Sequence, residues 1–225
     1  DASGAGSITA AQVDNGSSDA CGIADLSLSQ LTFDCTHVGT NAVTLTVTDN
    51  NGNQSVAQAT ITVLDEIDPV VLAQNVTVQL DANGAGSVTA AQIDNGSSDA
   101  CGIASLVLSQ TDFDCSHVGA NTVTLTVTDH NGNVSSIDAV VTVEDNVAPV
   151  ALAQNVTVQL DAAGNGSTTA DAVNNGSNDA CGIASLVVNP NTFTCADVGA
   201  NTVTLTVTDV NNNVSTCSST VTIAD

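Results

Sequence analysis

The segment TVTLTVT at residues 122–128, followed by DHNGN at 129–133, decides the fold class. Its apolar side chains alternate with threonines, and a period of two residues is typical of a strand with one buried face. The Asn-Gly pair in the following turn favours the positive φ angles of a tight hairpin. The segment therefore predicts a β-strand that turns back into a second, antiparallel strand over 134–143.

Shorter strands are expected ahead of this hairpin. We predict them over 75–80, 87–93 and 103–109, separated by loops rich in Gly, Asp and Ser, with an irregular stretch over 110–121. No segment shows helical periodicity over ten residues. Short strands bounded by turn signals at this spacing indicate an all-β fold, an antiparallel β-sandwich of the immunoglobulin-like class.

The same pattern occurs three times along the chain. VTLTVTD is found at 43–49, 123–129 and 203–209, which gives a period of 80 residues without insertion or deletion. A unit of this length is of domain size. We therefore predict tandem immunoglobulin-like domains that form an elongated rod, with boundaries at 1–65, 66–145 and 146–225.

The first copy lacks the strand that the second copy has at 75–80. The partners of the chain are accordingly expected to be further copies of the same repeat. They are either joined in a longer covalent array, which we favour, or present as a neighbouring molecule that donates the strand.

The charge of the chain excludes several classes of function. Its 225 residues include 24 acidic groups and no Lys or Arg, so the formal net charge is −24. Nucleic acids and anionic membrane surfaces are excluded as partners, because both are bound through Lys and Arg. The apolar runs are too short for a membrane span. Such a charge favours a cation as partner, and Ca²⁺ suits carboxylate and amide oxygens.

Each copy offers oxygen ligands at one predicted pole. In an immunoglobulin-like sandwich the turn before the last strand, the loop between the second and third strands and the N-terminal linker share that pole. An Asp-x-Asn-x-Asn turn directs alternate side chains to one side, as in calcium loops. The alternative interpretation is that these Asp and Asn residues only favour a tight hairpin turn and that the linker acids are solvated. The candidate ligands are Asp14, Asp19, Asp49, Asn51 and Asn53; then Asp65, Glu66, Asp68, Asp94, Asp99, Asp129, Asn131 and Asn133; then Glu144, Asp145, Asp179, Asp209, Asn211 and Asn213.

The cysteines also follow the repeat. Each copy has two, fourteen residues apart, and we predict that they form a disulfide within the copy in an oxidising compartment. A zinc site is disfavoured because no CxxC pair is present. Cys217 is extra, and is interpreted as a buried thiol or as an alternative partner for Cys181 or Cys195. The predicted pairs are Cys21–Cys35, Cys101–Cys115 and Cys181–Cys195.

Catalysis is not expected. His37 and His117 follow a cysteine by two residues, but the third copy has Asp197 at this position. Side chains two residues apart on an extended segment are also splayed rather than hydrogen-bonded, which disfavours a Cys–His pair. We therefore predict that the protein is not an enzyme.

Three sequence elements resemble a known family. SSDACGI, F-x-C-x-x-VG-x-N-x-VTLTVTD-x-NGN and the linker VTVEDNVAP at 141–149 are similar to hyalin-repeat (HYR-like) domains with an immunoglobulin fold. These domains recur in long bacterial surface proteins and in some animal extracellular proteins. The resemblance implies an extracellular or cell-surface array that is adhesive or structural.

The expected function is mechanical. We predict a non-catalytic stalk, surface fibre or adhesin, made rigid by Ca²⁺ at the domain junctions. Sequons such as Asn75 and Asn155 make glycans a further expectation. The alternative is a carbohydrate- or ice-binding module that uses a Thr-rich sheet face, as offered by Thr124, Thr126 and Thr128.

Overall fold

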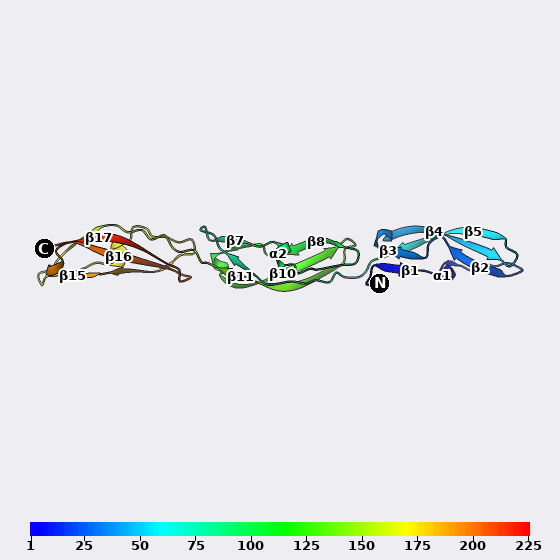
Figure 1. The fold of residues 1–225 in the computed structure, drawn as a ribbon, viewed down its shortest axis with the longest axis horizontal. Coiled ribbons are helices and arrows are strands. Elements are labelled where there is room, and N and C mark those ends of the chain that lie inside the picture. The colour runs from blue at the N-terminus through cyan, green and yellow to red at the C-terminus, as the bar shows by residue number, and fades with distance from the viewer. The chain divides into compact units, whose positions relative to one another are not determined.

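A computed structural model describes residues 1–225, and its regular structure is almost entirely β (Figure 1). The prediction of an all-β chain of tandem immunoglobulin-like sandwiches is confirmed. None of the short helices is long and apolar enough to cross a membrane.

The chain folds as two compact units, and the middle copy contributes to both. Unit 1 comprises Asp1–Gln74, Asp94–Ser109 and Thr124–Asp138. Unit 2 comprises Asn75–Ile93, Gln110–Val123 and Ala139–Asp225. Each unit therefore contains one junction between successive copies.

The third copy illustrates the architecture. Its main sheet has the order β12-β17-β16-β14, formed by Val156–Gln159, Val214–Ala224, Gly199–Asp209 and Ile183–Asn189. The hairpin β16–β17 and the pair β14–β16 are antiparallel, whereas β12 runs parallel to β17. A small second sheet pairs β13 (Asn165–Ser167) with β15 (Thr192–Thr194).

The other copies use the same elements. The middle copy has the sheet β6-β11-β10-β8 and the pair β7-β9, and the first copy has β2-β4-β5 and β1-β3. The middle-copy strands are Val76–Gln79 (β6), Ala85–Ser87 (β7), Ile103–Leu108 (β8), Asp112–Asp114 (β9), Gly119–Asp129 (β10) and Val134–Glu144 (β11). The first-copy strands are Ala5–Ser7 (β1), Ile23–Leu28 (β2), Thr32–Asp34 (β3), Gly39–Asp49 (β4) and Gln54–Val63 (β5).

Alternation along the long strands builds the core. In β16, Val203, Leu205 and Val207 are fully buried, and they belong to one cluster with Phe193 and Ile223. Burying a side chain of this size stabilises the fold by about 1.5–3 kcal/mol. The threonines between them face the other way and stay partly or fully exposed. The apolar period of two therefore determines both the strand and its buried face.

The strand predicted over 87–93 is wrong beyond its first residue. β7 ends at Ser87, and Ala90–Ile93 forms the helical turn α2, with Ile93 fully buried. The backbone N–H and the hydroxyl of Thr89 donate to Gln92 Oε1 at 2.8 and 3.0 Å. This local pairing favours a helical start over an extended strand. Equivalent turns are α1 (Ala10–Val13) and α3 (Ala170–Val173).

The stretch 110–121 contains β9, a 3₁₀ turn and the start of β10. The turn, η2, spans Cys115–His117, and its equivalents are η1 (Cys35–His37) and η3 (Cys195–Asp197). Asp114 precedes η2, and its Oδ1 accepts a hydrogen bond from Ser116 N at 2.9 Å. These turns place one cysteine of each copy.

Asp81 organises the turn between β6 and β7. Its Oδ1 accepts hydrogen bonds from the N–H groups of Ala85 and Asn83, at 3.0 and 2.8 Å. These bonds, with that of the Asn83 side chain, hold the pKa of the Asp81 carboxyl below its ordinary value of 3.8. They favour the ionised form in the folded protein.

We expect the stabilising effect of Asp81 to depend on pH. Because its folded pKa is lowered, the contribution is complete above about pH 3.8 and is lost as the pH falls through the folded value. The variant Asp81→Asn should therefore have a lower Tm than the parent protein at neutral pH. The difference should shrink below pH 3.8. Thermal unfolding followed by circular dichroism tests this, and a difference that is constant from neutral pH to pH 2 would contradict it.

Candidate metal site

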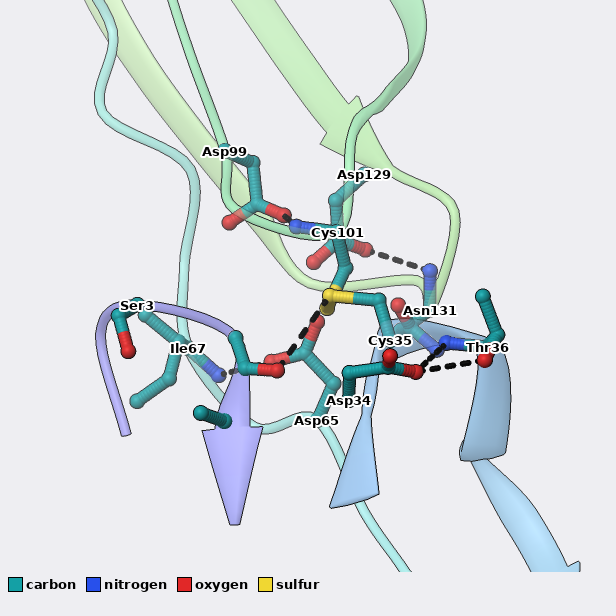
Figure 2. The surroundings of a disulfide bond; sticks show 12 residues. Ser3, Asp34, Cys35, Thr36, Asp65, Ile67, Asp99, Cys101, Asp129 and Asn131 are labelled. Carbon is teal, nitrogen blue, oxygen red and sulfur yellow. Dashed lines mark hydrogen bonds between the residues drawn. A yellow bond between two sulfur atoms is a disulfide. The ribbon is translucent and has the colours of Figure 1, made fainter. Parts of the chain in front are cut away.

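The disulfides join successive copies, and the prediction of bridges within each copy is wrong. Unit 1 contains Cys35–Cys101 and unit 2 contains Cys115–Cys181, each spanning 66 residues of sequence. Cys21, Cys195 and Cys217 are free thiols. Each bridge therefore crosses a junction between copies. Figure 2 shows the Cys35–Cys101 bridge.

The strand between the two cysteines of a copy explains the correction. Cys21 lies just before β2, and Cys35 lies beyond its far end, in η1. Six extended residues span about 20 Å. The Cα atoms of a disulfide are separated by 5.1 Å in Cys35–Cys101, so Cys21 and Cys35 cannot bond without rearranging β2.

Acidic side chains from different segments gather beside each bridge. In unit 1 one carboxylate oxygen each of Asp65 and Asp99 lies with Cys101 Sγ in a group whose members are all within 4.8 Å of one another. Figure 2 shows Asp65, Asp99 and Asp129 around the Cys35–Cys101 bridge. The sulfur is engaged in the disulfide, so the carboxylates are the candidate ligands.

Unit 2 repeats this arrangement with deeper burial. Asp145 and Asp179 lie with Cys181 Sγ within the same 4.8 Å limit. Asp145 Oδ1 accepts a hydrogen bond from Val147 N at 3.0 Å, but Asp145 Oδ2 is buried and has no hydrogen-bond partner. Only 6% of the Asp145 surface is exposed. In unit 1, Asp65 Oδ2 is likewise buried and unpartnered.

The Asp-x-Asn-x-Asn turn completes the unit 2 cluster. Asp209 is fully buried, and its Oδ1 accepts the N–H groups of Asn211 and Asn213, each at 2.8 Å. Asn213 Nδ2 donates to Asp209 Oδ2 at 2.8 Å and to the carbonyl oxygen of Asp145 at 3.0 Å. The turn is thereby tied to the linker, and Asn211 Oδ1 is buried without a partner.

Unit 1 has the same turn. Asp129 Oδ1 accepts from Asn131 N and Asn133 N at 2.8 Å each, and Asn133 Nδ2 donates to the carbonyl oxygen of Asp65 at 3.2 Å. The structure thus brings together the linker, the Asp99 or Asp179 loop and the turn at each junction, as the shared pole requires.

Other predicted ligands lie outside these clusters. Glu66 and Asp68 are exposed. Glu144 Oε2 accepts from Gln79 Nε2 at 2.6 Å and from Asn146 Nδ2 at 3.2 Å. Asp94 closes its own loop by accepting the N–H of Ser97 at 3.0 Å.

In the first copy the predicted ligands bond locally. Asp14 accepts from Ser17 N at 3.0 Å, and Asp19 accepts from Cys21 N at 2.7 Å. Asp49 accepts from the N–H groups of Asn51 and Asn53, each at 2.8 Å. These side chains repeat the local geometry of the later copies without a linker acid beside them.

A divalent cation fits the two junction clusters. Two carboxylate oxygens at the 4.8 Å limit of these clusters would repel by about 3.5 kcal/mol at an effective dielectric constant near 20. Each buried acceptor without a partner costs about 1–3 kcal/mol more. The chain has no Lys or Arg to offset either term. Carboxylate, amide and carbonyl oxygens are the ligands that Ca²⁺ prefers.

The histidines near the bridges do not form a nucleophilic pair with cysteine. His37 Nδ1 lies 2.8 Å from Asp34 Oδ1 and accepts the Asp34 N–H at 3.2 Å. Its ring packs edge-on against Phe33. Cys35 is in a disulfide and is therefore not a free nucleophile. The hydrogen bonds of His37 to Asp34 close the turn η1.

Comparisons with known proteins find weak structural similarity to cadherin and protocadherin extracellular domains. No family model and no curated protein matches it. Mouse clustered PcdhgC3 EC1-3 matches 87% of this chain and 83% of its own, with 13% identity and a TM-score of 0.37. Human CDH23 EC21-23 matches 81% and 74%, with 18% identity and a TM-score of 0.41. The protocadherin GammaB4 extracellular domain matches 89% and 43%, with 13% identity and a TM-score of 0.37. Since these TM-scores are below 0.5, function is inferred from the residues of the chain itself.

We predict that peptide mapping without reduction will recover the bridges between copies. Trypsin has no cleavage site, so a protease that cuts before Asp is needed. The peptide 34–48, which contains Cys35, should be linked to 99–111, which contains Cys101. Recovery of 34–48 linked to 19–24, which contains Cys21, would show a bridge within the first copy and contradict the structure.

Proposed function

We propose that the chain is a non-catalytic, extracellular structural repeat of a stalk, surface fibre or adhesin. In this proposal a disulfide and Ca²⁺ hold successive copies together at the same junction. The observation that carries it is the covalent bond from one copy to the next, with unpartnered carboxylate oxygens beside it.

The disulfides support an extracellular location and a load-bearing role. Such bonds persist in oxidising compartments. By the chain-entropy argument, closing a loop of 66 residues stabilises the folded state by about 4 kcal/mol. A bridge across a junction also prevents two copies from separating while each stays folded, which a bridge within one copy would not do.

Calcium would act on the same contact. In unit 2, Asp145, Asp179 and Asn211 would supply oxygens, and the bound ion would neutralise carboxylates that come from the linker and from the following copy. Asp209 would position Asn211 through the hydrogen bond that it accepts from the Asn211 N–H. A Ca²⁺ ion takes six to eight oxygens, so carbonyl groups and water would complete the shell.

The finer assignments follow from the same proposal. The HYR-like motifs and the domain boundaries at 1–65, 66–145 and 146–225 describe one repeated unit, and partners would be further copies of it. Each boundary falls at a linker acid, Asp65 or Asp145, that the proposal assigns to a calcium site.

We predict that calcium stabilises the junctions. Addition of Ca²⁺ to chelator-treated protein should raise its Tm by several degrees, because an ion that binds only the folded state stabilises that state against unfolding. The variants Asp145→Asn and Asp179→Asn should weaken calcium binding at least tenfold at the unit 2 site, as measured by calorimetry.

Asp171→Asn is the matched control for these variants. Asp171 is an exposed acid in the first turn of α3, so its replacement removes the same charge outside the cluster. It should leave calcium binding unchanged. Equal weakening by Asp171→Asn, or a Tm that is the same with Ca²⁺ and with chelator, would overturn the calcium assignment.

A further inference from the structure

The cysteine pairs follow a rule that leaves two complementary thiols. In each bridge the cysteine that opens a 3₁₀ turn, the turn cysteine, bonds the loop cysteine that precedes the third strand, β8 or β14, of the next copy. The turn cysteines are Cys35, Cys115 and Cys195, and the loop cysteines are Cys21, Cys101 and Cys181. Cys195 and Cys21 are both exposed and free, and they are one of each kind.

Cys195 has the local geometry of the bonded turn cysteines. Its Sγ lies 3.8 Å from the carbonyl oxygen of Gly164. The corresponding distances are 3.8 Å from Cys35 Sγ to Gly4 and 3.9 Å from Cys115 Sγ to Gly84. The free thiol therefore already occupies the position from which its equivalents bond.

The glycine beside each bonded turn cysteine contacts an Ala-Cys pair from the next copy. A Cβ atom built on Gly84 would lie 3.2 Å from Ala180 Cβ and 3.7 Å from Cys181 Sγ. Gly4 has the same relation to Ala100 and Cys101, at 3.2 and 3.6 Å.

Gly164 has the same backbone conformation, with φ of +78° against +73° at Gly84. A Cβ atom on Gly164 would meet Cys195 Sγ and no other atom within 4 Å. No Ala-Cys pair therefore covers Gly164, whereas one lies beside Gly4 and Gly84.

Cys21 presents the matching pair. Ala20-Cys21 corresponds to Ala100-Cys101 in the sequence. Cys21 N donates to Asp19 Oδ1 at 2.7 Å, as Cys101 N does to Asp99 Oδ1 at 2.7 Å. The loop that carries Cys21 therefore has the same hydrogen bond as the loop that carries Cys101. In the middle copy, this loop reaches the turn cysteine Cys35.

We propose that Cys195 forms a disulfide with the loop cysteine of a further copy of the repeat, and Cys21 with a turn cysteine of another. Between two molecules of the 225-residue chain, Cys195 of one would therefore bond Cys21 of the other. The contact joins two different surfaces, so it leaves one thiol of each kind free at every step and propagates as a linear polymer. The chemistry is thiol–disulfide exchange with an oxidant such as oxidised glutathione. The two thiols give up two protons and two electrons to form one S–S bond, and the glutathione disulfide is cleaved to two glutathione thiols.

The test is oxidation of the intact 225-residue chain with a glutathione redox buffer in the presence of Ca²⁺, followed by electrophoresis without reductant. We expect a ladder at multiples of the 22.2 kDa chain that collapses to one band on reduction. Peptide mapping should then recover Cys195 linked to Cys21. A chain that loses its free thiols while it remains a monomer would overturn the proposal.

Single variants separate this contact from random oxidation of exposed thiols. Cys21→Ser and Cys195→Ser should each stay monomeric, and an equimolar mixture of the two should stop at a dimer. Cys217→Ser should still form the ladder. Dimers of either of the first two variants alone, or a ladder that requires Cys217, would overturn the proposal. These results with the cysteine variants do not depend on whether the Asp145→Asn and Asp179→Asn variants bind Ca²⁺.

Discussion

The rest of this structure depends on one electrostatic constraint. The chain has many carboxylates and no cationic side chain to pair with them. The chain carries 24 acidic groups and no Lys or Arg. Away from the junctions, acids such as Asp81 are satisfied by backbone N–H groups of their own turn. At the junctions the local N–H groups satisfy one oxygen of Asp65 and of Asp145 and leave the other buried and unpaired. The proposed Ca²⁺ ion would supply the positive charge that the sequence lacks.

The disulfide and the acidic cluster depend on one another. The bridge fixes the loop that carries Asp179 against the preceding copy, and that loop carries Cys181 two residues later. Fixing the loop holds Asp179 beside Asp145, at a distance that is unfavourable for two unneutralised carboxylates. The covalent bond thus offsets the repulsion, and a bound ion would convert the same proximity into an attraction.

Much of the fold could be predicted because one physical signal dominates it. Alternation in β16 identifies the strand and its buried residues, and the topology of the sandwich places the Asp209 turn beside the linker. The helical turn α2 was missed because Thr89 and Gln92 pair locally, and this capping signal competes with a short alternating pattern. The unpartnered Asn211 Oδ1 depends on packing and has no sequence signal.

The disulfide pairing could not be predicted from spacing. In a tandem repeat each turn cysteine follows one loop cysteine by fourteen residues and precedes the next by 66. Loop-closure entropy changes slowly with length, so it does not decide between the two. What decides is the rigid extension of β2 between Cys21 and Cys35. The strand between the two cysteines of a copy therefore selects the bond between copies. Its length cannot be read from the cysteine spacing alone.

A crystal structure grown with Ca²⁺, with the ion identified by anomalous scattering, tests the central claim most directly. We predict an anomalous peak at each junction, bonded to Asp65 and Asp99 in unit 1 and to Asp145 and Asp179 in unit 2. Junction carboxylates that contact only water in calcium-grown crystals, or ions bound solely to exposed acids such as Glu66 and Asp68, would contradict it.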